Sequence, residues 1–212
     1  EASGNFSTAM GSGTEASGIF STAMGRSTEA SGDYSTAMGR DTEASGDYST
    51  AMGNGTTASG EVSTAMGQST EASGTYSTAM GAVTTASDYG SLVIGRYNSS
   101  GSTVTNSATA FSTANTAFVI GNGADGNNIS DAFSILFDGT TNIAGSVTAT
   151  SFVGDGSQLT GITGSASSLN DLTDVLVGNN SMFLGTPPTN STGIDNTALG
   201  ENSLKLNTTG VK

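Results

Sequence analysis

The amino-acid sequence predicts an all-β protein whose N-terminal part is a parallel β-roll of stacked coils. Three observations predict it: a repeat of fourteen residues, a glycine at every seventh position within that repeat, and a predominance of small residues over large apolar ones. Internal repeats of short, fixed period are typical of solenoid folds, in which each repeat packs on its neighbours. The repeat covers residues 1–97, which we predict to be one roll domain.

Each fourteen-residue unit holds two half-units, exemplified by Phe20-Ser-Thr-Ala-Met-Gly25 and Thr28-Glu-Ala-Ser-Gly32. A seven-residue spacing also suits a coiled coil. However, large apolar residues do not fill both core positions here, and each glycine costs about 1 kcal/mol relative to alanine in a helix. Short strands joined by turns fit better, because glycine adopts positive φ without penalty. We predict strands over Ser21–Gly25 and Thr28–Gly32, in coils stacked about 4.8 Å apart.

The alternation of side chains along these strands separates an inner from an outer face. The first-strand alanines are small enough for the interior of a very narrow coil: Ala9, Ala23, Ala37, Ala51, Ala65 and Ala79. The repeat's glutamates are expected to face water: Glu15, Glu29, Glu43 and Glu71.

A column of methionines and aromatic residues forms a large apolar stripe that such a coil has no room to enclose. A stripe of this length is a liability on a monomer, so we predict that it packs against the same stripe of other chains around a shared axis. The predicted interface consists of Met10, Met24, Met38, Met52, Met66 and Met80 with Phe6, Phe20, Tyr34, Tyr48 and Tyr76.

The composition excludes several classes of function. Hydrophobic residues make up 34% of the chain, below the roughly 45–50% apolar share of ordinary globular domains, so a thick core of large side chains cannot form. With 5 Lys and Arg against 18 Asp and Glu, the net charge is -13, and no basic face for nucleic acid can be assembled. Membrane insertion of this segment is not expected, because no stretch approaches the ~20 apolar residues of a membrane helix.

Catalysis is not expected, and no catalytic, cofactor-binding or metal-binding residue is assigned. Histidine and cysteine are absent, which removes Ser-His-Asp, Cys-His and thiol chemistry. Asp125 and Asn127, within Gly121–Asn128, offer hard oxygen ligands to Ca²⁺. The segment does not match an EF-hand loop, however, and we favour a simple β-turn.

Two threonine ladders follow the strand spacing, one along Thr8, Thr22 and Thr36 and the other along Thr14, Thr28 and Thr42. Regular threonine ladders can match an ice lattice, which makes an ice-binding β-solenoid a minor alternative. The preference of threonine for strands is the simpler explanation. A recognition surface is expected on the outer face and turns, including Asp33, Arg40, Asp41 and Asp47.

The sequence beyond the repeat predicts three further regions. Residues 98–165 are predicted to be a β-rich connector with strands at Ala117–Asn122 and Asp131–Gly139. Residues 166–178 are predicted to be a linker, and residues 179–212 the start of a second roll-like repeat region.

Within the last region, Asn180–Gly185 and Asn196–Gly200 are predicted to begin new coils. The chain starts at Glu1 in the middle of a repeat and stops at Lys212 within a Thr/Gly-rich pattern, so we expect it to be a fragment of a longer protein.

The alternation of Ser-Thr-Ala-Met-Gly with Thr-Glu-Ala-Ser-Gly resembles the head repeats of YadA-type trimeric autotransporter adhesins. The usual strand motif of that family reads Ser-Val-Ala-Ile-Gly, and Ser91-Leu-Val-Ile-Gly95 comes closer to it than the methionine-containing copies. The resemblance implies a left-handed parallel β-roll and a homotrimeric fibre, with its chains intertwined or side by side.

The segments Gly145–Ile162 and Ser168–Val175 resemble parts of phage tail fibres and of bacterial surface proteins that carry an endosialidase-type C-terminal chaperone. Together, the resemblances imply an extracellular structural fibre that attaches to a host or cell-surface receptor, with a glycan as one candidate. The leading setting is a phage tail fibre on a virion. The alternative is a trimeric adhesin on a bacterial cell surface.

Overall fold

A computed structural model describes residues 1–151, 153, 175–178, 181–184 and 197–199. All regular structure in these residues is β-strand, which confirms the predicted all-β class. The chain divides into two compact units, Glu1–Ala149 and Thr150–Lys212, which are described separately.

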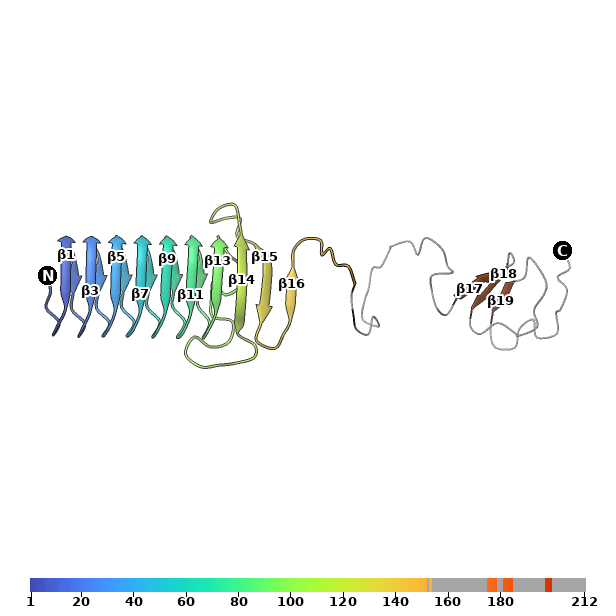
Figure 1. Ribbon diagram of the computed structural model, residues 1–212, viewed down its shortest axis with the longest axis horizontal. Helices are drawn as coiled ribbons and strands as arrows, with labels where there is room; N and C mark the ends of the chain where they lie inside the picture. The colour runs from blue at the N-terminus through green and yellow to red at the C-terminus, as the bar shows by residue number, and fades with distance from the viewer. Residues whose placement is uncertain (152, 154–174, 179–180, 185–196, 200–212) are drawn as a thin grey trace. The chain divides into compact units, whose positions relative to one another are not determined.

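The first unit begins with a roll in which each coil contributes one long and one short strand (Figure 1). The long strands are β1 (Thr8–Ser12), β3 (Thr22–Arg26), β5 (Thr36–Arg40), β7 (Thr50–Asn54), β9 (Thr64–Gln68), β11 (Thr78–Ala82) and β13 (Leu92–Arg96). The short strands are β2 (Glu15–Ala16), β4 (Glu29–Ala30), β6 (Glu43–Ala44), β8 (Thr57–Ala58), β10 (Glu71–Ala72) and β12 (Thr85–Ala86). Long strands pair only with long strands and short with short, in parallel, so the predicted stacked roll is confirmed.

The register of the ladders follows the repeat. Each residue pairs with its equivalent fourteen positions along the chain, as in Ala23 with Ala37 and Met24 with Met38. Identical side chains therefore form straight columns along the stack. The period of the sequence is the length of one coil.

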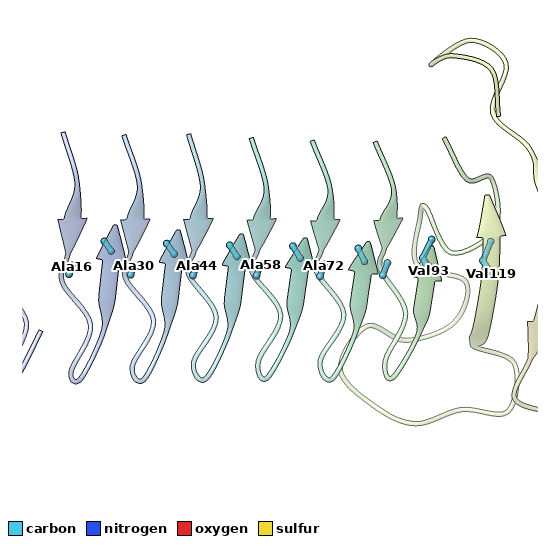
Figure 2. Packing of buried hydrophobic residues seen from close by; sticks show 13 residues of the cluster. Ala16, Ala30, Ala44, Ala58, Ala72, Val93 and Val119 are labelled. Atoms are coloured by element: carbon cyan, nitrogen blue, oxygen red, sulfur yellow. The ribbon is translucent and has the colours of Figure 1, made fainter. Parts of the chain in front are cut away.

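The core of the roll is a double column of alanines that ends in two valines (Figure 2). Every member is fully buried: Ala16, Ala23, Ala30, Ala37, Ala44, Ala51, Ala58, Ala65, Ala72, Ala79, Ala86, Val93 and Val119. Ala9, at the first coil, is only partly buried. Methyl groups suffice because the two sheets lie so close together that larger side chains have no space. Small polar side chains complete the interior, as where the buried Ser21 hydroxyl donates to the carbonyl of Gly18 at 2.7 Å.

The observed strand boundaries differ from the predicted ones, and the difference shows why glycine recurs in the repeat. The long strand β3 starts one residue late and runs through Gly25 to Arg26, while β4 is only two residues long. Gly25 has φ of 127°, and a Cβ there would lie 1.9 Å from the carbonyl oxygen of Gly39. This glycine is therefore required by the close approach of the next coil. In the turn that follows β3, the residue with a left-handed conformation is Ser27, at φ of 53°.

The aromatic column, predicted to form one stripe with the methionines, lies outside the long strands. Phe20 has φ of 56°, a left-handed conformation that places it in the turn before β3. The equivalent residues Tyr34, Tyr48, Val62 and Tyr76 have the same conformation. Positive φ is uncommon for residues other than glycine and a genuine outlier for a β-branched residue such as Val62.

The roll continues into three further strands: β14 (Thr116–Asn122), β15 (Asp131–Leu136) and β16 (Thr141–Ile143). Strand β14 pairs in parallel with β13, and Val119 stacks on Val93. Strands β15 and β16 then add in antiparallel orientation, which ends the solenoid path. The long-strand sheet thereby reaches ten strands.

Buried polar side chains hold residues 98–115 against the end of the roll. Asp88 occupies the position that is glycine in each earlier coil, and its carboxylate accepts hydrogen bonds from the N–H groups of Thr105 (2.6 Å) and Thr116 (2.7 Å). The amide of Asn98 accepts from the N–H of Thr85 at 2.8 Å and donates to its carbonyl at 2.9 Å. A single side chain thus imitates the backbone of a further strand and closes the six-stranded sheet.

The second unit contains β17 (Val175–Gly178), β18 (Ser181–Leu184) and β19 (Thr197–Leu199). Strands β18 and β19 fall in the two predicted coil starts and pair in parallel, as coils of a roll would. Strand β17, at the end of the predicted linker, pairs with β18 in antiparallel orientation. The predicted domain boundaries at 97, 165 and 178 stay predictions, and most of the linker lies outside the described residues.

Candidate functional site

The outer face of the ten-stranded sheet carries two parallel rows of side chains, which we call the outer stripe. The methionine row consists of Met10, Met24, Met38, Met52, Met66 and Met80, and the threonine row of Thr8, Thr22, Thr36, Thr50, Thr64 and Thr78. Met10, on β1, is 58% exposed, and the other methionines are half-buried. Much of this apolar surface is therefore open to water.

The stripe extends beyond the residues predicted for it. The methionine row continues through Ile94, Ile120, Phe133 and Ile143, and the threonine row through Leu92, Phe118 and Ile135. Leu92 and Ile94 lie within the predicted roll. Sequence reasoning missed the other residues as part of the face because it assigned residues 98–165 to a separate connector. The alternation of Phe118 with Ile120 and of Phe133 with Ile135 was the available signal.

The aromatic column borders the stripe at the N-terminal ends of the long strands. Phe6, Phe20, Tyr34 and Tyr48 stack face to face, with centroid separations of 4.8, 5.2 and 5.0 Å between successive rings. Val62 interrupts the stack. Beyond it, Tyr76 meets Tyr89 edge to face at 5.3 Å. Because neighbouring rings cover one another's faces, the column presents mainly ring edges to solvent, which suits packing against a chain better than stacking on a sugar.

The predicted recognition residues lie at the ends of the long strands, Arg40 as the last residue of β5 and the aspartates in the adjoining turns. Asp33 and Asp47 precede the aromatic residues, and each accepts a backbone hydrogen bond from the coil before it. Asp33 Oδ1 binds the N–H of Ile19 at 2.8 Å, and Asp47 Oδ1 binds that of Asp33 at 3.0 Å. Arg40 Nε lies 3.4 Å from Asp41 Oδ2, with both side chains half-exposed. The aspartates therefore support the turns as well as supplying surface charge.

The Gly121–Asn128 segment is a turn in which the Asp125 carboxylate is hydrogen-bonded to residues of the same turn. Asp125 accepts hydrogen bonds from the N–H groups of Asn127 (2.9 Å) and Asn128 (3.1 Å) and from the Asn128 side chain. The Asn128 side chain, followed by the Asn127 N–H, lowers the pKa of Asp125 below its ordinary value. These contacts support the preferred β-turn interpretation over a calcium site. Among the described residues, no group of three or more acidic, His or Cys side chains could hold a metal ion.

One of the two threonine ladders is not a surface feature. Thr14, Thr28 and Thr42 are at most 5% exposed, so they cannot meet an ice lattice. The other ladder, the threonine row, is half-buried beside the methionines over most of its length. Within the part of the chain that the structure describes, no helix is long and apolar enough to span a membrane.

The stacked coils and the outer stripe define a repeat protein of the β-solenoid class. Residues 2–98 match the YadA head domain repeat in six overlapping windows, at 2–28, 16–42, 30–56, 44–70, 58–84 and 72–98. These residues are therefore a run of YadA-type head repeats, and the resemblance inferred from the sequence is confirmed. The match covers a little under half of the chain and supports an adhesin-like, surface-exposed role in coarse outline. No curated protein matches the chain significantly.

Proposed function

We propose that this chain is a non-enzymatic segment of an extracellular attachment fibre and that it associates as a homotrimer through the outer stripe. The observation that carries the proposal is the continuity of the stripe, from Met10 on β1 to Ile143 on β16. Monomeric soluble proteins rarely expose one contiguous apolar surface of this extent. Covering it with other copies of the chain removes that surface from water.

The shape of the repeat supports a fibre. All copies of the repeat project the same side chains in the same direction, so parallel chains can pack along their whole length. The YadA-type head repeats favour an adhesin-type trimer, because heads of that family are trimeric. The absence of His and Cys from the sequence supports a structural rather than a catalytic role.

Two settings fit such a fibre. The head repeats favour a bacterial cell-surface adhesin. The first expectation, a phage tail fibre on a virion, depends on the segments 145–162 and 168–175, most of which lie outside the described residues. In either setting the receptor is proposed to be a host or cell-surface molecule, with a glycan as one candidate, and the exposed turns carrying Asp33, Asp47 and Arg40 are the surface proposed to meet it.

The decisive experiment is the mass of the native particle in solution, measured by light scattering at several concentrations. We expect three times the chain mass of 20.8 kDa. The double variant Met38→Glu with Met52→Glu should dissociate to monomers, because it places charges in the buried centre of the interface.

A matched control is Thr57→Glu, on the outer face of the six-stranded sheet. Four other coils already carry glutamate in that column, so the control should fold and remain a trimer. A wild-type chain that stays monomeric at all concentrations would refute the proposed function.

A further inference from the structure

The outer stripe contains almost all of the sulfur in the protein. Six of the seven methionines lie in the methionine row, one on each long strand from β1 to β11, and the sequence has no cysteine. The seventh, Met182, lies on β18 in the second unit. Peroxides and other two-electron oxidants react in proteins chiefly with sulfur. In this chain, such an oxidant therefore meets nearly all of its targets in one straight column.

The methionine row is partly open to water at every level of the roll. Met10 is 58% exposed, and the methionines of the other five coils are half-buried. Side chains in strands stand roughly perpendicular to the sheet. The inner part of each methionine is therefore covered by its neighbours in the row, and the outer part, which carries the sulfur, points away from the roll.

The packing of the sheet does not require sulfur in this row. Ile94 on β13 stacks in register on Met80, and Ile120 on β14 stacks on Ile94. Isoleucine suits a strand well and has no atom that a peroxide oxidises. The row thus accepts a residue that resists oxidation, yet six successive coils carry one that does not.

Oxidation makes this apolar row polar. A sulfur lone pair attacks hydrogen peroxide, one oxygen atom is transferred to the sulfur, the O–O bond breaks, and water leaves. The sulfur is oxidised by two electrons, and the peroxide is reduced by two. The product is a sulfoxide, which is polar and accepts hydrogen bonds. Because equivalent methionines pair in register, as Met24 does with Met38, sulfoxides at successive levels form a continuous polar ladder.

We propose that the methionine row is an oxidation site through which a peroxide controls the association of the chains. The inference rests on the proposed association through the outer stripe and adds a modification that blocks it. The thioethers react in the unassembled chain and are covered in the assembled fibre. A sulfoxide oxygen that enters the interface loses its hydrogen bonds to water, and each one left without a partner weakens assembly about tenfold. Enzymatic reduction restores the thioethers, so the modification is reversible.

The first test uses the full chain with Met182→Leu, in which every remaining thioether belongs to the row. The chain is treated with hydrogen peroxide at low protein concentration until its intact mass stops rising, and fragment masses locate the added oxygen atoms. Light scattering then gives the particle mass over a range of concentrations. We expect one added oxygen atom for each methionine of the row. Assembly should weaken at least about a hundredfold, the effect of two unpartnered sulfoxides, while the circular dichroism of the strands is unchanged.

The second test compares the rates of oxidation in assembled and unassembled chains. The unassembled reference is Met38→Glu with Met52→Glu, the variant expected to dissociate, which keeps four methionines of the row. These four should be oxidised at least about tenfold faster than the same four in the assembled wild type, because susceptibility to oxidation follows exposure.

Two controls attribute the effect to the sulfoxides. Treatment of the oxidised chain with methionine sulfoxide reductases specific for each epimer should restore both the original mass and the assembly. A second chain carries isoleucine in place of all six methionines of the row, as the sheet already does at Ile94 and Ile120. Its affinity is compared before and after treatment, and peroxide should not change it.

The outcomes separate the inference from the proposed function. If the untreated chain assembles and its oxidised form assembles with the same affinity, or if the row takes up no oxygen, the inference is overturned while the proposed function stands. The same holds if oxidation abolishes the strand signal, or if peroxide weakens the isoleucine variant equally. Equal oxidation rates in assembled and unassembled chains would place the interface elsewhere and overturn both. An untreated chain that never assembles also overturns both.

Discussion

Two glycines in one coil both have positive φ, but only one of them lies in close contact with the next coil. Replacing each with alanine therefore tests the packing of the roll. Gly53 lies within β7 with φ of 131°, and a Cβ there would lie 2.0 Å from the carbonyl oxygen of Gly67. Gly55, two residues later, has φ of 65°, and its nearest neighbour to a Cβ would be Ser69 Oγ at 3.6 Å. Equivalent positions already hold Ser27 and Asp41.

The expected magnitudes follow from these contacts. A non-glycine residue at the φ of Gly53 costs about 1–3 kcal/mol, and the ladder with the next coil must also open, so Gly53→Ala should destabilise by about 3 kcal/mol or more. Gly55→Ala meets no close contact, and its left-handed conformation costs about 1–2 kcal/mol. The reduced entropy of the unfolded chain offsets about 0.4–1 kcal/mol of that cost in both variants. The net change for Gly55→Ala should therefore be about 1 kcal/mol or less.

Urea denaturation followed by circular dichroism at one fixed protein concentration compares the two variants with the wild type. Because both substitutions are Gly→Ala, effects on the unfolded chain nearly cancel in the difference, which should be about 2 kcal/mol or more. Equal destabilisation would refute the reasoning, since it would mean that the spacing between coils does not exclude a methyl group at Gly53.

Three further predictions concern the core, the end of the roll and a surface turn. Ala51→Leu should destabilise the roll by about 1–3 kcal/mol, because a fully buried site between close sheets cannot accept extra methylenes; thermal denaturation measures it. Asp88→Ala should accelerate hydrogen exchange at Thr105 and Thr116, whose N–H groups lose their acceptor, and unchanged protection would contradict the assignment. Hydrogen bonding lowers the pKa of Asp125, so the stability that it contributes is present above its unfolded value and lost as the pH falls through the lower folded value. The amide signal of Asn127 should therefore remain unchanged until the pH falls below about the ordinary carboxyl value of 3.8, as followed by nuclear magnetic resonance.

The sequence predicted the coil length, the strand pairing and the inner and outer faces, because each follows from a period that the residues display directly. It did not predict that Phe20 would lie in a turn with positive φ, outside the row that the methionines form. Positive φ at a bulky residue is disfavoured locally and is imposed here by the bend between coils. It also could not show that Asn98 closes one sheet, since a lone asparagine carries no signal of its partner thirteen residues back.

The connector was separated from the roll for a related reason. Strand β14 stacks on β13 across an interval that breaks the fourteen-residue period, so periodicity alone could not join them. The candidate interface was therefore found only in part: the methionine row was evident, and its continuation through Ile120 and Phe133 required the sheet topology.

Comparison of the coils with one another strengthens the proposed interface. The interior column is alanine in every coil from Ala23 to Ala79, as expected where no other side chain fits. On the outer face of the six-stranded sheet, the equivalent column holds glutamate in some coils and threonine in others, as at Glu43 and Thr57. The methionine row also lies outside, yet it does not vary from Met10 to Met80.

Free surface positions of this roll have therefore diverged between coils, whereas the outer stripe is as uniform as the core. In a monomer, the exposed half of each side chain in such a row would contact only water, so no packing contact would require the same residue in every coil. Uniformity is expected where each coil packs against the same surface of another chain, since a substitution in one copy then changes the contacts of every copy around the axis.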